Sequence, residues 1–178
     1  MKKLLALAAL ASLGGVALQA QAADVGLGVA VQSDDSRIYV PIDFGDAWRL
    51  EPSVRYLHSK SSSGGGSFKN ESFELGVGAF AFLPLHESVR LYYGGRLAYI
   101  EAETTDTSFG SRNSIKADGY RISPTVGFEY LINKHISIGG EAEWFYADVD
   151  SSPDDGFFYG ADQKSQGTDT RLVVRVRF

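Results

Sequence analysis

The feature that most constrains this chain is a strict alternation of apolar and polar residues, seen most clearly in its last eight residues, RLVVRVRF. Leu172, Val174, Val176 and Phe178 alternate there with Arg171, Val173, Arg175 and Arg177. A period of two residues is the signature of a β-strand, because successive side chains point to opposite faces. The same period recurs over residues 25–31, 37–43, 48–56, 73–81, 89–99, 120–129 and 136–146. The sequence therefore predicts an all-β protein of eight strands.

Short and long connections alternate between these segments. Three connections are short: Gly45–Ala47, Pro84–Ser88 and Asn133–Lys134. Three others are long and polar: Ser59–Asn70, Thr104–Lys116 and Asp148–Thr168, whereas the first, Ser33–Ser36, is short. An up-and-down antiparallel barrel with tight turns at one end and long loops at the other produces this pattern.

The two faces of the predicted strands have an unusual polarity. One set is aliphatic in the middle and aromatic at the ends, with Tyr56, Phe73, Tyr99, Tyr120, Trp144 and Tyr146 beside the long loops and Phe44, Trp48, Phe128, Tyr130 and Phe178 beside the short turns. Two aromatic girdles around an apolar band are typical of a barrel whose outside faces lipid. The alternative is a soluble eight-stranded barrel, which would place apolar residues inside and charges outside. We therefore expect a transmembrane β-barrel that is closed by pairing of the last strand with the first.

The other set of side chains combines small residues with charges of both signs, and we expect it to line the lumen. An eight-stranded barrel is just wide enough to be filled by its own side chains, and a buried charge needs a partner. We therefore predict an Arg/Glu network that plugs the barrel. The alternative is a narrow ion path that favours anions near Arg175 and Arg177. The charged residues assigned to the lumen are Arg49, Glu51, Arg55, Glu74, Arg90, Arg96, Arg121, Glu129, Glu141, Glu143, Arg171, Arg175 and Arg177.

The first 22 residues have the pattern of a cleaved secretory signal peptide. Lys2 and Lys3 precede a mostly apolar run, and Ala20-Gln21-Ala22 fits the small-residue cleavage site. Cleavage would leave residues 23–178 as one barrel domain, and loss of two lysines would take the formal net charge from −5 to −7. That charge disfavours a nucleic-acid partner, which would need a basic face. The chain contains no cysteine, so disulfide and thiol chemistry are excluded.

These features together resemble the small eight-stranded outer-membrane β-barrels of Gram-negative bacteria, the group of the OmpA transmembrane domain and OmpX. The resemblance covers residues 23–178. It implies an outer-membrane location, contact with membrane lipid and lipopolysaccharide, and a monomeric state. It also implies that the terminal pattern of Leu172, Val174, Val176 and Phe178 is the signal read by the barrel assembly machinery.

Few residues suggest catalysis or ligand binding. His135 and Ser137 lie near Glu141 and Glu143, which is a weak hydrolytic combination because His135 belongs to a short turn and Ser137 has the lumen phase. His58, His86 and His135 have no metal-ligand spacing. The acidic stretch from Asp148 to Gly156 fails the pattern of an EF-hand calcium loop, and we interpret it as a solvated loop, with a looser Ca²⁺ or Mg²⁺ site as the alternative. We expect no catalytic residue, no cofactor and no metal ligand.

The remaining candidate for contact with a surface partner is Phe157-Phe158-Tyr159, three consecutive aromatic residues in the last long connection. We expect them to pack over the barrel mouth, to enter the outer leaflet or to bind a partner. The sequence thus favours a non-enzymatic role in envelope structure and surface interaction. A small channel is the second hypothesis, and a lipid-modifying enzyme is the third.

Overall fold

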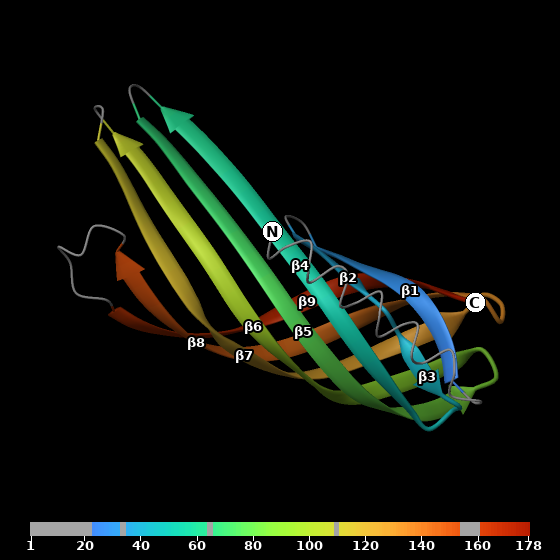
Figure 1. Ribbon diagram of the computed structural model, residues 1–178. Coiled ribbons are helices and arrows are strands. Elements are labelled where there is room, and N and C mark those ends of the chain that lie inside the picture. The colour runs from blue at the N-terminus through green and yellow to red at the C-terminus, as the bar shows by residue number, and fades with distance from the viewer. Residues whose placement is uncertain (1–22, 33–34, 64–65, 109–110, 154–160) are drawn as a thin grey trace.

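The structure is a computed structural model that describes residues 23–32, 35–63, 66–108, 111–153 and 161–178. These residues form antiparallel strands in a single sheet that closes on itself (Figure 1). No helix in the part of the chain that the structure describes is long and apolar enough to cross a membrane. The strands are β1 (Ala23–Gln32), β2 (Asp35–Tyr39), β3 (Ile42–Phe44), β4 (Trp48–Ser63), β5 (Gly66–His86), β6 (Val89–Ser108), β7 (Ser111–Leu131), β8 (Ile136–Pro153) and β9 (Ala161–Arg177).

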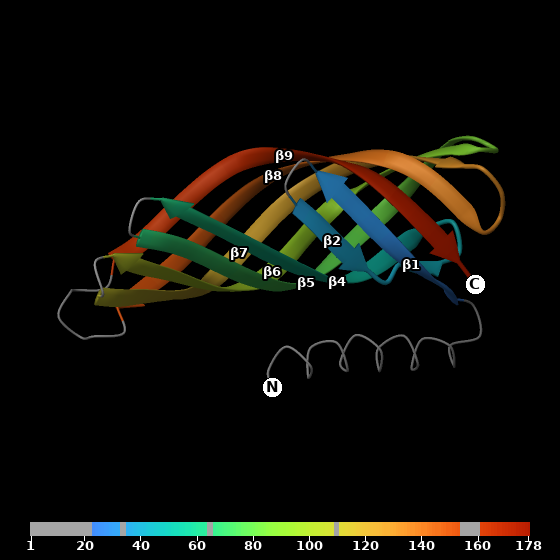
Figure 2. The same cartoon turned by 90° about the horizontal axis from the view of Figure 1, so that it is seen from above.

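The ring closes where the last strand pairs with the first, as the sequence predicted. β9 runs antiparallel to β1, in a register that extends from Gly26 opposite Arg177 to Val31 opposite Leu172. Figure 2 shows β9 lying beside β1, with the C-terminus next to the start of β1. Each remaining strand pairs with its neighbour in the chain, so the topology is up-and-down. The expectation of an antiparallel up-and-down barrel is therefore confirmed.

The predicted second strand is divided into two short strands, β2 and β3. Both halves keep one register against β1, with Tyr39 opposite Gly28 and Ile42 opposite Val25. The division occurs at Pro41, which has no N–H to give to the ladder, although its carbonyl still accepts a hydrogen bond from the Gly26 N–H at 2.9 Å. The barrel thus has eight strand positions, one of which is interrupted. Ile42 and Val25 have the outward phase but are buried, and as a directly opposed pair they cover part of each other.

The three long connections differ from the expectation, because most of their residues continue the strands. β4 and β5 stay paired up to Ser63 opposite Gly66, and β6 and β7 up to Ser108 opposite Ser111. Ser, Gly and Thr suggested loops by composition, but polar strands can form when a neighbouring strand supplies backbone partners. Figure 1 shows β4 to β7 rising together as a sheet well beyond the ends of β1 and β2. We call this extension, residues 56–63, 66–73, 99–108 and 111–120, the protruding sheet.

The outside of the ring is apolar over the height of the barrel. Leu97, Ile122 and Val126 each expose more than half of their surface, a state that would be unfavourable in water. Trp48, Phe128 and Tyr130 are exposed near the short turns, and Tyr56, Tyr120 and Trp144 near the opposite end. The two girdles and the band between them therefore lie where the sequence predicted, and the band suits contact with hydrocarbon.

We predict that charge is tolerated outside this band but not within it. Leu97→Arg should lower the free energy of unfolding by about 2–4 kcal/mol, the cost of an arginine on the lipid face of a barrel near the bilayer midplane. Urea unfolding in lipid vesicles measures this change. Phe68→Arg is the control, because Phe68 is 49% exposed, close to the 54% of Leu97, but lies outside the band, on the face of the protruding sheet that continues the lumen phase. Equal effects of the two substitutions would contradict a lipid-facing band.

Candidate functional site

The lumen of the ring contains the densest set of charged side chains. The structure places all thirteen charged residues assigned to the lumen in ion pairs, and adds Arg37, Asp43 and Asp169 to them. Arg37 and Asp43 have the lumen phase, so the period of two was the signal that could have included them. Asp169 follows the connection that was assigned to a loop. The contacts form three layers between the short turns and the opposite end, which we call the mouth.

The layer nearest the short turns is organised around Glu129. Its carboxylate accepts hydrogen bonds from Arg90 Nε at 2.7 Å, Arg177 Nη2 at 2.6 Å and Arg49 Nη2 at 3.3 Å. Asp43 accepts from the same three arginines at 2.5–3.1 Å. These residues come from β3, β4, β6, β7 and β9, so the layer joins opposite walls of the ring.

The middle layer is organised around Arg96, which extends across the lumen from β6. Its guanidinium donates to both carboxylate oxygens of Glu141 on β8, at 2.6 and 2.9 Å, and to Glu51 on β4. Arg175 on β9 donates to the other oxygen of Glu51 at 3.2 Å. Tyr92 links the two halves, because its hydroxyl donates to Glu141 at 3.2 Å and accepts from Arg175 at 3.3 Å. Charge-assisted and two-point bonds of this kind are the strongest hydrogen bonds in proteins.

The mouth layer is organised around Glu143. This carboxylate contacts Arg121 at 2.5 Å, Arg171 at 2.6 Å and Arg37 at 3.3 Å. Its second oxygen is also 3.5 Å from Arg96, which connects the mouth to the middle layer. Further pairs in this layer are Arg37–Glu74 at 2.9 Å, Arg55–Glu74 at 3.1 Å, Arg121–Glu74 at 3.9 Å, Arg121–Asp169 at 2.7 Å and Arg171–Asp169 at 3.0 Å.

Aromatic rings fill the lumen between the charges, and glycines make room for them. A Cβ on Gly127 would lie 2.2 Å from the ring of Tyr92, so only glycine lets this ring lie flat against β7. The Arg175 guanidinium lies 4.9 Å from the centre of the same ring, within range of a cation–π interaction. Arg96 lies 4.8 Å from the ring of Phe80 in the same manner. The rings therefore hold the middle arginines in place as well as excluding water.

The hydrolytic combination considered from the sequence is not assembled. Ser137 is fully buried and its hydroxyl donates to Glu129 within the turn-side layer. The His135 ring contacts the backbone oxygen of Arg177 at 3.2 Å, and the Asn133 side chain caps the turn by accepting from the His135 N–H at 2.8 Å. The His135 ring and the Ser137 hydroxyl each have a different partner, so the histidine is not placed to activate the serine as a nucleophile.

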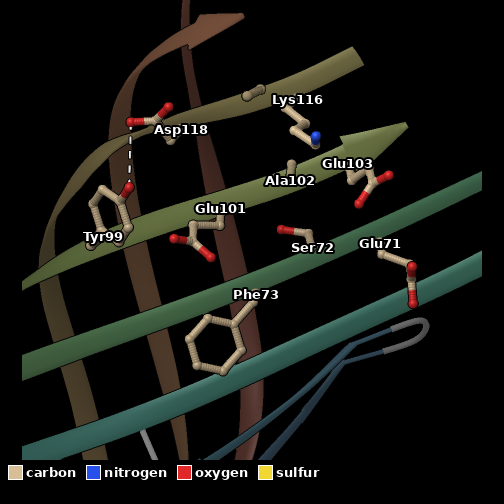
Figure 3. Close-up of a pocket in the computed structure, with 10 residues that line it drawn as sticks. Glu71, Ser72, Phe73, Tyr99, Glu101, Ala102, Glu103, Lys116 and Asp118 are labelled. Carbon is tan, nitrogen blue, oxygen red and sulfur yellow. Dashed lines mark hydrogen bonds between the residues drawn. The ribbon is translucent and has the colours of Figure 1, made fainter. Parts of the chain in front are cut away.

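The outer face of the protruding sheet has a hollow of about 390 Å³ that begins at the mouth-side girdle (Figure 3). Phe73, Tyr99, Glu101 and Asp118 line it, and the Tyr99 hydroxyl donates to Asp118 at 3.3 Å. The carboxylates form part of a row across four strands, in which Glu101 is opposite Asp118, Asp118 opposite Asp150, and Asp150 opposite Asp162. The pKa of Asp150 is raised above its usual value, because its protonated carboxyl donates a hydrogen bond to Asp162 and because the two carboxylates repel each other when both are charged. The described residues contain no group of three ligating side chains suited to a metal ion.

The terminal strand presents its apolar side chains outward, as the alternation requires. Leu172, Val174 and Val176 are exposed along β9, and Phe178 exposes 79% of its surface beside the short turns. Arg171, Arg175 and Arg177 of the same strand are buried in the lumen. The aromatic residues Phe157, Phe158 and Tyr159 and the signal-peptide residues 1–22 lie outside the described residues.

Comparison with known proteins identifies the fold. No protein-family model matches the chain, and no curated protein matches it. A major outer membrane protein of Thermus thermophilus matches with a TM-score of 0.66 at 13% identity, over 89% of this chain and all of that one. Neisserial surface protein A matches with a TM-score of 0.55 at 17% identity, over 88% of this chain and 94% of the other. The attachment invasion locus protein Ail of Yersinia pestis, in complex with the heparin analogue sucrose octasulfate, matches with a TM-score of 0.58 at 15% identity, over 89% and 100%. This chain has the fold of the small outer-membrane barrels.

We predict that the middle layer contributes strongly to stability. Arg96→Met should lower the free energy of unfolding by about 3–5 kcal/mol, because it leaves Glu51 and Glu141 buried without their main partner. Urea titration in lipid vesicles, followed by tryptophan fluorescence, measures the change. Lys164→Met is the control: Lys164 is exposed and 3.7 Å from Asp148, and such surface pairs contribute less than about 1 kcal/mol. A similar small effect for Arg96→Met would show that the network does not stabilise the barrel.

Proposed function

We propose that this chain, which has the fold of the small outer-membrane barrels, is an integral outer-membrane protein with a non-enzymatic role in envelope structure and surface interaction. The observation that carries the proposal is the inverted polarity of the ring. Its outside exposes aliphatic and aromatic side chains, while its inside holds paired arginines and carboxylates. A closed ring satisfies every backbone group between its strands, which is what a β-structure needs to span hydrocarbon.

The ion pairs favour a plugged lumen over the alternative of a channel. Arg96 spans from β6 to Glu51 and Glu141 on opposite sides of the ring, so charged groups occupy the centre of the cross-section. The rings of Phe80 and Tyr92 pack beside them and are almost completely buried. A conducting path would require these contacts to separate. Because the nine arginines of the described lumen exceed its seven carboxylates, such a path would favour anions.

The absence of a catalytic arrangement at His135 and Ser137 supports a non-enzymatic role over a lipid-modifying enzyme. Ser137 is buried in the turn-side layer, away from the lipid face. The lumen carboxylates are held by arginines, and acid–base catalysis requires a group that can exchange a proton with substrate.

The protruding sheet supports a role in surface interaction. β4 pairs with β2 only between Ser53 and Arg55, whereas it pairs with β5 as far as Ser63. On the other side of β4, residues Leu57 to Ser62 therefore have no strand partner among the described residues, and His58 to Ser62 are exposed. An unpaired strand edge can accept a strand from another protein through backbone hydrogen bonds. We propose that this edge and the outer hollow meet partners outside the cell, and the Phe157-Phe158-Tyr159 segment stays a separate candidate for such contact.

Planar bilayers test the plugged lumen. We expect residues 23–178, refolded into a bilayer, to give no discrete current steps, because ion pairs fill each layer of the lumen. A heat-dependent shift in gel mobility shows independently that the protein is folded. Reproducible steps with anion preference would overturn the plug and establish the channel.

Hydrogen exchange tests the free edge. We expect alternate amides between Leu57 and Ser62 to exchange as fast as solvated amides, because successive N–H groups of an antiparallel strand point to opposite sides. Amides of Ala102 to Thr105 on β6 are the control, since β6 is paired on both sides there. Uniformly slow exchange along Leu57 to Ser62 would show that the edge is covered.

A further inference from the structure

The lipid-facing surface of the barrel contains a hollow of about 520 Å³ where β7, β8 and β9 lie side by side. It is a depression in the outside of the ring and is separate from the lumen network and from the protruding sheet. Its outward-pointing lining comprises Leu91 of β6 together with Val126, Phe128, Gly140, Ala142, Thr170 and Leu172.

The hollow originates in the sequence of β8. The outward row of this strand is Ile138, Gly140, Ala142 and Trp144, so two small residues lie between two large ones. Ile138 and Trp144 are both exposed and limit the hollow along the strand. The floor is therefore low over two consecutive outward positions, about 7 Å along a β-strand.

The neighbouring strands supply the side walls. One ladder row places Val126 opposite Ala142 and Ala142 opposite Thr170, and the next places Phe128 opposite Gly140 and Gly140 opposite Leu172. Val126, Phe128 and Leu172 each expose between 51% and 56% of their surface, so they stand above the floor. A Cβ on Gly140 would be 2.8 Å from the Phe128 ring, which shows that this ring leans over the glycine and narrows the hollow.

The chemistry of the lining is almost wholly apolar. Glu141 and Arg171 border the hollow through the backbone, but their side chains are buried in the lumen and ion-paired. The hydroxyl of Thr170 is the one polar side-chain group on the outward lining described above. A ligand that fills the hollow must therefore be apolar along its length.

We propose that this hollow binds one acyl chain of a membrane lipid and retains it longer than the rest of the barrel surface retains lipid. The inference rests on the proposed membrane location, which places the hollow in hydrocarbon between the two girdles. Association inside a bilayer depends on van der Waals packing rather than on exclusion of water. An acyl chain lying in the hollow contacts a floor and two walls, and so gains more dispersion contacts than an acyl chain that lies against a convex part of the barrel surface.

A second copy of the chain fits the hollow less well than an acyl chain. A stable protein interface involves about 20–30 residues on each side, far more than line this depression. The volume is in the range of small-molecule sites.

Native mass spectrometry tests the proposal, with dipalmitoylphosphatidylethanolamine as the probe. The protein is refolded with this lipid, transferred to detergent and released in the gas phase, and we expect one lipid to remain bound. Ala142→Leu fills the floor and should reduce the retained fraction about tenfold, equivalent to roughly 1.4 kcal/mol of binding free energy. Thr170→Leu should act in the same direction.

Ala79→Leu is the matched control, because Ala79 is an exposed, outward alanine on β5, outside the hollow. It should leave lipid retention unchanged. Equal retention by the Ala142 and Ala79 variants, or no retained lipid in the unchanged protein, would overturn the acyl-chain site. A dimer that Ala142→Leu dissociates would overturn it in favour of a second copy. Failure to insert into vesicles or to show the heat-dependent gel shift would instead contradict the proposed membrane location.

Discussion

Every property of this barrel depends on the hydrogen-bonded pairing of β9 with β1. That pairing converts an open sheet into a ring, removes both edges over the height of the barrel, and gives the strands an inside and an outside. Only in a closed ring does alternation along a strand become a division between lumen and exterior. The sequence RLVVRVRF shows this division in its shortest form. Its arginines and Val173 are buried in the lumen, whereas Leu172, Val174, Val176 and Phe178 face outward.

Closure also explains why so many charges can be buried in a small protein. The lumen is narrow, so one arginine can reach carboxylates on two different strands, as Arg96 on β6 does with Glu51 on β4 and Glu141 on β8. Desolvation of these groups is costly, and it is offset only if each charge finds several partners. Glu129 and Glu143 each meet four arginines in the structure. The network is therefore a packed polar core, and the hydrophobic surface that other proteins bury is on the outside.

The alternation predicted which side chains face the lumen and which face outward. It did not predict which carboxylate each arginine would contact. The phase of Arg96 places it in the lumen, whereas its choice of Glu51 and Glu141 depends on stagger and side-chain length across the ring. Composition was misleading beyond the barrel, where Ser59–Asn70 suggested a loop but its described residues continue β4 and β5. Such polar strands depend on pairing with neighbours, which a local pattern does not reveal. The sequence pattern likewise did not predict the hollow at Gly140 and Ala142, because its walls are side chains of β7 and β9.

The most direct test of the inverted polarity measures whether residues 172 to 177 of β9 face lipid or the lumen, position by position. The chain has no cysteine, so single cysteines can be introduced there and spin-labelled without background. Paramagnetic relaxation by dissolved oxygen and by a water-soluble nickel chelate then reports whether each label meets lipid or water. We predict high oxygen accessibility at positions 172, 174 and 176 and low accessibility to both reagents at 173, 175 and 177. Nickel accessibility at 172, 174 and 176, or no alternation, would contradict a lipid-facing exterior around a filled lumen.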